Sequence, residues 1–277
     1  MIGLGSVARL AQLRFEVEGF EAHIWRIWGM YRKIMMSWLI RPFVIRIGWI
    51  LSKVLLDVRV DGIENLTKTS RPTIVISNHF SWFDAPILAV HLPFAPAFVV
   101  ATESQRHWWF RAFVTVFHGI PIWRGQVDRS AFQKSMEAID EGYVVGIFPE
   151  GGMDPEFAEL VAQGRQVSRY IPGRRVPELT RPKSGTAWLA IKAESVILPV
   201  GLLGTERVYR NMLRFRRTPV TLRIGRPFGP LQLEPGLRGK ARRQRLDELA
   251  DLMMQQIAAL FPPEARGPYS NMELKSL

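Results

Sequence analysis

The stretch TIVISNHFSWFDAP, residues 73–86, joins a short apolar run to a polar turn and then to the start of a helix. Residues 73–77 are rich in β-branched side chains, which is typical of a buried strand. Asp84, with Pro86 two positions later, is typical of a helix N-terminus. Because ligand crevices in α/β sheets form where a strand ends and a helix begins, the polar residues between these elements are the first candidate functional residues.

Short apolar runs and segments with helical spacing alternate through the rest of the chain. The further strand candidates are Ala97 to Ala101, Val144 to Phe148, Ile197 to Gly201 and Thr221 to Ile224. The helix candidates are Asp84 to His91, His107 to Phe117, Ser130 to Glu141 and an amphipathic segment from Leu246 to Leu260. This alternation predicts an α/β domain with a mixed, largely parallel sheet flanked by helices.

The composition limits the classes of protein to be considered. The chain has 277 residues, 47% of them apolar, and no cysteine, which excludes a disulfide-stapled scaffold, a thiolate nucleophile and a cysteine metal site. The formal net charge is +12, and such a charge implies an anionic partner. The candidates are nucleic acid, an anionic lipid surface, a phosphorylated ligand and an acidic carrier protein. The aromatic residues lie in apolar runs and not among basic residues, which argues against nucleic acid.

Ile34 to Leu56 is the most apolar stretch of the chain, but three basic residues interrupt it. On the insertion scale its apolar residues gain roughly 4 to 7 kcal/mol, while each basic residue near the middle costs about 2.5 to 3.5 kcal/mol. We therefore expect a helix that lies in the headgroup region of an anionic membrane and does not span it. The alternative is a helical hairpin whose apolar stripes pack on the main domain. Residues 1–19 lack the pattern of a secretory signal, so we expect peripheral or monotopic association at the cytoplasmic face.

These observations predict two parts of the chain. Residues 1–59 form an N-terminal amphipathic helical segment, a membrane-associating helical hairpin that precedes the sheet, and residues 60–277 form the α/β domain. Within that domain, residues 153–182 contain four prolines and several arginines and are too broken for a regular element. We predict a long basic insertion there, because loops of this length usually serve a function or are mobile.

His79 and Asp84 lie five positions apart, directly after the first predicted strand. Histidine accepts a proton near neutral pH, and a carboxylate bonded to its other nitrogen would fix the tautomer and stabilise the imidazolium. Such a pair would activate a hydroxyl group. Two structural interpretations remain open: an Asp84 that only caps the helix, and a His79 that is a hydrogen-bonded core residue.

Three further motifs accompany this pair. Gly119 to Arg124 ends in a lone arginine, Phe148 to Gly152 reads Phe-Pro-Glu-Gly-Gly, and Ile197 to Gly201 is a predicted strand with a proline. Together with Asn-His-x-Ser-x-x-Asp at residues 78–84, they resemble the four sequence blocks of the glycerolipid acyltransferases. This is the lysophospholipid (1-acylglycerol-3-phosphate) acyltransferase family, and the resemblance extends over roughly residues 60–269.

The resemblance implies transfer of a fatty acyl group from a thioester, on acyl-CoA or acyl carrier protein, to the hydroxyl of a lysophospholipid or glycerol phosphate. It implies that His79 is the general base and Asp84 its partner. The residues implied in substrate binding are Asn78, Ser81, Arg124, Glu150, Gly151 and Lys183, with Arg124 assigned to the acceptor's phosphate. A thioester is already activated, so the reaction requires no metal and no other cofactor.

The third block departs from the family pattern. Gly151 is followed by Gly152 and Met153, where the family usually has Thr-Arg, so the phosphate-binding arginine of that block is absent. We expect arginines of the insertion, Arg174 and Arg175 among them, to return positive charge to the same crevice. Two alternatives from other classes remain: a metal-dependent hydrolase with the same His and Asp as ligands, and a non-enzymatic basic membrane-binding protein.

Overall fold

The computed structural model describes residues 40–66, 73–102, 108–123, 128–152, 173–174 and 176–271. Residues Ile47–Leu277 form one compact unit, and the sheet and the candidate site both belong to it. The first arm of the predicted N-terminal hairpin lies outside the described residues, as does most of the predicted insertion.

Seven strands of the described residues form one sheet, in the order β1-β7-β6-β2-β5-β3-β4. Their bounds are β1 Leu56–Asp61, β2 Thr73–Ser77, β3 Ala97–Ala101, β4 Ile120–Ile122, β5 Val145–Ile147, β6 Val196–Leu203 and β7 Thr218–Ile224. Neighbouring strands pair in parallel, except that β6 and β7 are antiparallel. The predicted mixed, largely parallel sheet flanked by helices is therefore confirmed.

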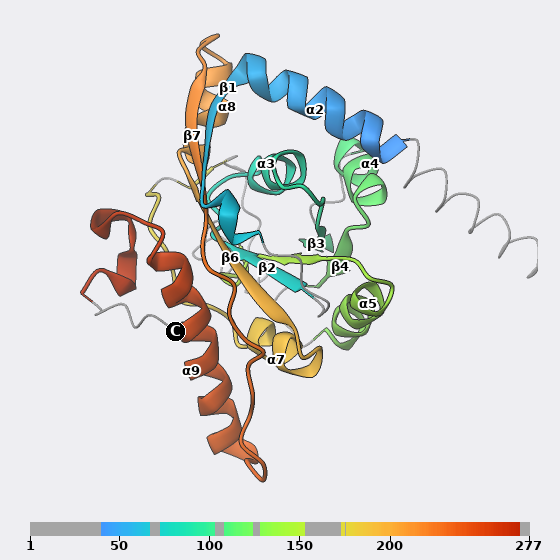
Figure 1. The fold of residues 1–277 in the computed structure, drawn as a ribbon, viewed down its shortest axis with the longest axis vertical. Coiled ribbons are helices and arrows are strands. Elements are labelled where there is room, and N and C mark those ends of the chain that lie inside the picture. The colour runs from blue at the N-terminus through green and yellow to red at the C-terminus, as the bar shows by residue number, and fades with distance from the viewer. Residues whose placement is uncertain are drawn as a thin grey trace, which may run out of the picture. The chain divides into compact units, whose positions relative to one another are not determined.

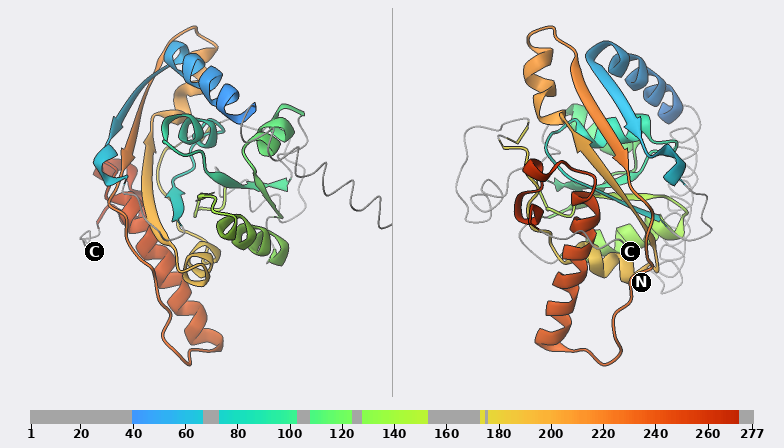
Figure 2. Two further views of the ribbon diagram at one scale, coloured as in Figure 1. Left: turned by 45° about the vertical axis from the view of Figure 1, so that its right-hand side comes forward. Right: turned by 60° about the vertical axis from the view of Figure 1, so that its left-hand side comes forward.

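Helices cover both faces of this sheet (Figures 1 and 2). They are α2 Arg41–Leu55, α3 Asp84–His91, α4 Trp108–Val116, α5 Arg129–Asp140, α7 Gly185–Lys192, α8 Val208–Met212 and α9 Gly239–Ala258. Short 3-10 helices are η2 Ile63–Asn65, η4 Thr205–Arg207, η5 Pro263–Ala265 and η6 Gly267–Tyr269. Figure 1 shows α5, α7 and α9 on one face and α3 on the other. The loop between β2 and α3 thus joins the sheet to the helix on one of its faces.

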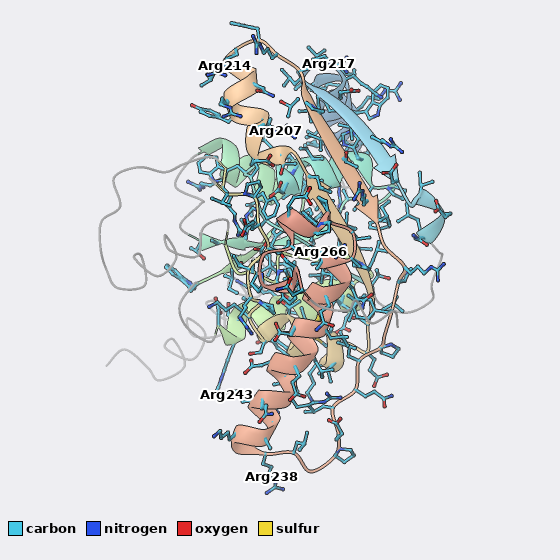
Figure 3. The ribbon with its side chains drawn as sticks, turned by 90° about the vertical axis from the view of Figure 1, so that its left-hand side faces the viewer. Arg207, Arg214, Arg217, Arg238, Arg243 and Arg266 are labelled. Carbon is cyan, nitrogen blue, oxygen red and sulfur yellow. The ribbon has the colours of Figure 1, made fainter. Side chains whose placement is uncertain are left out.

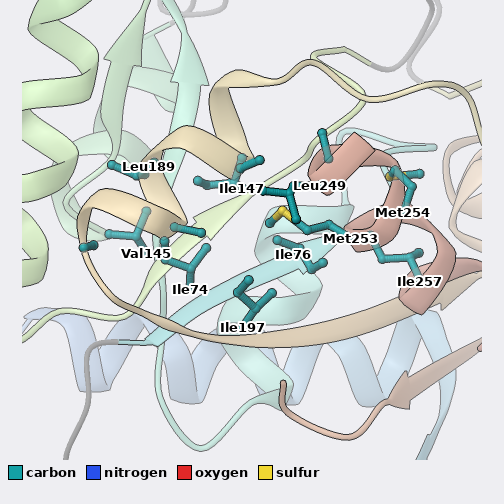
Figure 4. Close-up of a cluster of buried hydrophobic side chains, with 14 of the residues drawn as sticks. Ile74, Ile76, Val145, Ile147, Leu189, Ile197, Leu249, Met253, Met254 and Ile257 are labelled. Atoms are coloured by element: carbon teal, nitrogen blue, oxygen red, sulfur yellow. The ribbon is translucent and has the colours of Figure 1, made fainter. Parts of the chain in front are cut away.

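The main core lies between the sheet and α9, which is the predicted C-terminal amphipathic helix (Figure 4). Ile76 of β2 and Met253 and Ile257 of α9 are completely buried there. Burying each such side chain stabilises the fold by about 1.5 to 3 kcal/mol. Because β2 and α9 are anchored in this core, the end of β2 is a rigid base for the residues that follow it.

Helix α2 packs on α3 through small and polar residues. A Cβ at Gly48 would come within 2.8 Å of Val90 Cγ2, and Ser52 Oγ lies 3.3 Å from His91 Nε2. Ser52 is the buried residue of this helix. Other residues of this helix are exposed, among them Trp49, Ile50, Leu51 and Val54. The helix therefore turns apolar side chains to its surroundings, the reverse of an ordinary surface helix of a soluble domain.

The structure differs from the sequence-based expectation at the start of the sheet. Leu56–Asp61 is strand β1, which pairs in parallel with β7, so the expected boundary between residues 59 and 60 falls inside a strand. Its hydrophobic residues follow the apolar helix without a break in the sequence, which hid the change from helical to alternating spacing. β7 also begins three residues earlier than predicted, at Thr218. Among the described residues, no helix is both long enough and apolar enough to cross a membrane.

Candidate active site

The candidate site forms where β2 and β5, two parallel neighbours in the sheet, reach their carboxyl ends. Asn78 and His79 follow β2, and Phe148, Pro149 and Glu150 follow β5. Because parallel strands end at the same edge of a sheet, the first and third sequence motifs meet although 71 residues separate His79 from Glu150.

His79 and Asp84 form the predicted pair. Nδ1 of His79 lies 2.9 Å from Oδ2 of Asp84, with the carboxylate fully buried and the imidazole 15% exposed. The carboxylate can only accept at this contact, so Nδ1 carries the proton and donates it. Nε2 is then the nitrogen with a lone pair. The pair has the arrangement of a general base with an orienting carboxylate.

The backbone holds the Asp84 carboxylate in place. Its Oδ2 also accepts hydrogen bonds from the backbone N–H groups of Phe80 and Ser81, both at 2.7 Å. Asp84 is the first residue of α3, and Phe83 occupies the N-cap position. The interpretation of Asp84 as a mere helix cap is therefore wrong, because its carboxylate bonds to the loop before the helix and to His79.

Aromatic packing fixes the imidazole ring. His79 stacks on Phe148, with ring centroids 4.1 Å apart and planes inclined by 13°. Phe148 in turn stacks on Phe98 at 5.5 Å. The ring is therefore held on one face by an aromatic column and at Nδ1 by a carboxylate, which limits its rotation.

Glu150 is buried next to this pair and accepts hydrogen bonds from several groups of the site. Its Oε1 accepts the backbone N–H of His79 at 2.9 Å. Its Oε2 accepts Nη1 of Arg174 at 2.7 Å, the Thr180 N–H at 3.0 Å and the Thr180 hydroxyl at 2.6 Å. Both oxygens thus bond to the protein itself, which favours a positioning role for Glu150 over the direct acceptor contact that the resemblance implies.

Arg174 enters the site from the returning end of the insertion. Its guanidinium lies 5.0 Å from the ring centroid of Phe80 and also donates to the carbonyls of Glu178 and Gly152. Its backbone N–H donates to the Phe80 carbonyl at 2.7 Å. The structure contradicts the expectation that Arg174 supplies charge to the acceptor, because its side chain is 6% exposed and bound to Glu150. Arg175 lies outside the described residues.

Asn78 and Ser81 also serve the loop. The Asn78 amide is completely buried and makes two bonds with the backbone of Leu202, donating to its carbonyl at 2.8 Å and accepting its N–H at 2.7 Å. Ser81 is completely buried, pairs with Gly173 in an isolated bridge, and its hydroxyl accepts the Phe83 N–H at 3.3 Å. We interpret both as positioning residues, in place of the predicted substrate contacts.

Gly151 and Lys183 lie together at the surface of the site. Gly151 has a φ of +75°, and a Cβ there would come 3.2 Å from Cγ of Lys183. The Lys183 N–H donates to the Pro149 carbonyl at 2.8 Å, and its side chain is exposed. The Lys183 ammonium group thus lies beside the third motif, where an anionic group of a substrate can reach it. Arg124, the predicted phosphate contact, lies outside the described residues.

Sequence reasoning missed Arg174 and Thr180 as partners of Glu150. Both follow a stretch broken by prolines and glycines, where no periodicity indicates a neighbour. The one available signal was the missing arginine of the third motif. Among the described residues, no three His, Asp or Glu side chains gather as ligands for a metal ion.

Comparisons with known proteins identify the family and the fold of the chain. The acyltransferase family model matches residues 57–203, just over half of the chain. A 1-acyl-sn-glycerol-3-phosphate acyltransferase from Bacillus subtilis (strain 168) is 28% identical over 139 residues, which are 48% of this chain and 69% of that relative. The crystal structure of the 1-acyl-sn-glycerophosphate (LPA) acyltransferase PlsC from Thermotoga maritima is similar at a TM-score of 0.52 and 21% identity. That likeness covers 81% of this chain and 86% of the other, and it shows the fold.

Proposed function

Because the chain belongs to the acyltransferase family and is an O-acyltransferase, we propose that it moves a fatty acyl group from a thioester to a lysophospholipid or glycerol phosphate hydroxyl. The donor is acyl-CoA or an acyl carrier protein thioester. The observation that carries this proposal is the 2.9 Å bond between Nδ1 of His79 and Asp84 at the end of β2. It leaves Nε2 as a positioned base beside the surface of the site.

In the proposed reaction, Nε2 of His79 takes the proton of the acceptor hydroxyl while the hydroxyl oxygen attacks the thioester carbonyl carbon. The new C–O bond forms a tetrahedral intermediate. Its collapse breaks the C–S bond, and the departing sulfur takes the proton back from Nε2. Asp84 stabilises the imidazolium between these two steps, so protons and electrons balance without a covalent enzyme intermediate.

We propose 1-acyl-sn-glycerol-3-phosphate as the acceptor. The name of the Bacillus subtilis relative supports this choice. The exposed Lys183 beside Gly151 supports a negatively charged head group, since its ammonium can pair with a phosphate. Arg124 is the second proposed phosphate contact, by resemblance alone.

We propose that the enzyme is a peripheral or monotopic protein on an anionic membrane, at the cytoplasmic face. Its lipid acceptor resides there. The apolar side chains that α2 exposes support this location, with Trp49, Ile50, Leu51 and Val54 between 48% and 64% exposed. In the headgroup region these residues would leave water while Lys53 keeps its charge near lipid phosphates.

The proposal is tested with the purified full chain, acyl-CoA and a panel of lysolipids, with the products identified by mass spectrometry. We expect transfer to 1-acyl-sn-glycerol-3-phosphate, and we expect His79→Ala to lose at least about 100-fold in rate. Full activity of that variant would refute the assignment of the base, and absence of any acyl transfer would refute the function.

A chelator distinguishes the metal-dependent hydrolase. Nδ1 of His79 and Oδ2 of Asp84 bond to each other, which makes these two atoms unavailable as metal ligands and favours the acyltransferase. We expect full activity in excess chelator, and a loss that added metal restores would support the hydrolase instead.

A further inference from the structure

The turn between α8 and β7 carries exposed apolar side chains. We call residues 209–217 the α8–β7 tip. Phe215 is fully exposed at 101%, Leu213 is 62% exposed and Tyr209 is 42% exposed. The turn is fixed, because the N–H groups of Phe215 and Arg216 donate to the carbonyls of Met212 and Asn211. Phe215 has a φ of +51°, a left-handed conformation that is costly for a bulky residue. A fixed turn that holds a whole phenyl ring outward favours a binding role for that ring.

The same tip is strongly basic. Residues 209–217 contain four arginines and no acidic residue. They are Arg210, Arg214, Arg216 and Arg217, all of them exposed; Arg207, just before the tip, is also exposed and pairs with Glu206 at 3.2 Å. Figure 3 shows Arg207, Arg214 and Arg217 at one end of the ribbon, far from Arg238 and Arg243 at the start of α9. An apolar ring among guanidinium groups fits the interface of an anionic bilayer, where the ring enters the acyl boundary and the cations pair with phosphates.

The tip lies at the same edge of the sheet as His79. β6 is parallel to β2, and Leu202 near its end holds Asn78 through two hydrogen bonds. Beyond β6 the chain continues through η4 directly into α8, most of which belongs to the tip. A surface that contacts the tip is therefore on the side of the molecule where the acceptor must arrive.

The tip is also continuous with the exposed apolar face of α2. Nη2 of Arg217 donates to the Leu56 carbonyl at 2.7 Å, and Leu56 directly follows α2. Thr218, the first residue of β7, pairs with Leu56. Figures 1 and 2 show the end of α2 beside the α8–β7 turn in each view. One flat partner that covers both surfaces is a bilayer.

We propose that the α8–β7 tip is a second membrane-contacting element, in which Phe215 and Leu213 enter the interface and the arginines bind anionic lipid phosphates. This inference rests on the proposed membrane location of the enzyme. Together with α2, the tip provides two points of contact at one sheet edge, which orients His79 toward the lipid surface.

The test measures binding of the full chain to vesicles of phosphatidylcholine, with and without an equal amount of phosphatidylglycerol. We expect the double variant Leu213→Ser with Phe215→Ser to bind both vesicle types about 10- to 100-fold more weakly. We expect Arg214→Gln with Arg216→Gln to weaken binding to anionic vesicles alone, with the loss disappearing at high salt. All four positions are exposed, so these changes leave the fold intact.

Matched controls remove similar groups elsewhere. Ile63 is 65% exposed and lies beyond the other end of β1, so Ile63→Ser tests loss of an apolar surface residue away from the tip. Arg238→Gln with Arg243→Gln removes the same charge from α9. We expect both controls to bind within about twofold of the wild type. With acyl-CoA and a short-chain monomeric lysolipid, the tip variants should keep their kcat/KM, and with vesicle-bound acceptor it should fall.

Three outcomes would overturn the inference. If the wild-type chain does not bind vesicles, the proposed membrane location fails together with the tip. If the wild type binds and the tip variants bind equally well, the tip fails alone and α2 remains. If the tip variants keep vesicle binding but lose activity only with an acyl carrier protein donor, the surface is a docking site for the acidic carrier.

Discussion

Replacing Arg174 by methionine removes one half of a buried ion pair while keeping a long side chain in place. The Arg174 side chain is 6% exposed, and that of Glu150 is not exposed at all. Without the guanidinium, the donors that the described residues still offer to the Glu150 carboxylate are neutral, namely the His79 N–H and the two groups of Thr180. Breaking a buried pair on one side costs about 3 to 5 kcal/mol, because the remaining charge is uncompensated.

This free energy translates into a large thermal shift. A unit of the size of Ile47–Leu277 changes its Tm by about 2 to 4 °C per kcal/mol, so Arg174→Met should unfold about 6 to 20 °C below the wild type. The measurement is thermal unfolding followed by circular dichroism. Arg181→Met is the matched control. Arg181 is 77% exposed and forms a long ion pair with Asp251 at 3.9 Å, so its loss should cost less than about 1 kcal/mol.

The double variant Glu150→Gln with Arg174→Met separates the ion pair from simple loss of packing. Because it removes both charges, we expect it to recover at least half of the stability lost in Arg174→Met. Below the unfolding temperature, Arg174→Met should lower kcat more than it raises KM, since Glu150 holds the backbone of His79. An Arg174→Met protein that unfolds within 2 °C of the wild type would refute the reasoning.

Three further predictions concern single residues. Asp84→Asn should keep the fold but lower kcat at least about 100-fold, because the amide cannot stabilise the imidazolium of His79; an acyl transfer assay with unchanged kcat would contradict this. Asn78→Ala should cost about 2 to 6 kcal/mol in a urea titration, because it leaves the N–H and carbonyl of Leu202 unsatisfied in the core; a loss below 1 kcal/mol would argue against this pairing. Burial, opposed by a hydrogen bond to a backbone carbonyl, lowers the pKa of His91 below 6.5. The unfolded chain therefore protonates the His91 imidazole more readily than the folded chain does. The contribution of neutral His91 to the free energy of unfolding is thus complete above pH 6.5, and it is lost as the pH falls through 6.5 toward the folded pKa. His91→Gln should reduce the fall in Tm between about pH 7.5 and about pH 5, and an unchanged fall would refute this assignment.

The sequence alone was sufficient for the elements whose pattern is local. β2, β3 and α3 have the predicted bounds, because a run of β-branched residues and a proline in the first turn act within a few positions. The pairing of His79 with Asp84 was also accessible, since both lie in one loop. β1 was missed because its residues continue an apolar stretch, so composition gave no sign of the change in spacing.

Long-range partners could not be predicted in this way. The family resemblance implied that Asn78 contacts the substrate, yet its amide bonds to Leu202, 124 residues later. Glu150 finds its counter-charge 24 residues away, after a segment without periodicity. Such pairs depend on which strands are neighbours, and strand order follows from packing of the whole domain and not from any local pattern.

The end of β6 connects the His79 loop to the proposed membrane contact. Leu202 holds the His79 loop through Asn78, and two residues later Gly204 turns the chain toward the tip. Gly204 has a φ of +92°, and a Cβ there would come within 2.4 Å of the Pro219 carbonyl oxygen, so a larger residue would displace β7. A rigid connection at Gly204 fixes the direction of Phe215 relative to His79. A flexible one would let the tip bind lipid without orienting the base, and docking would then contribute affinity without positioning the acceptor.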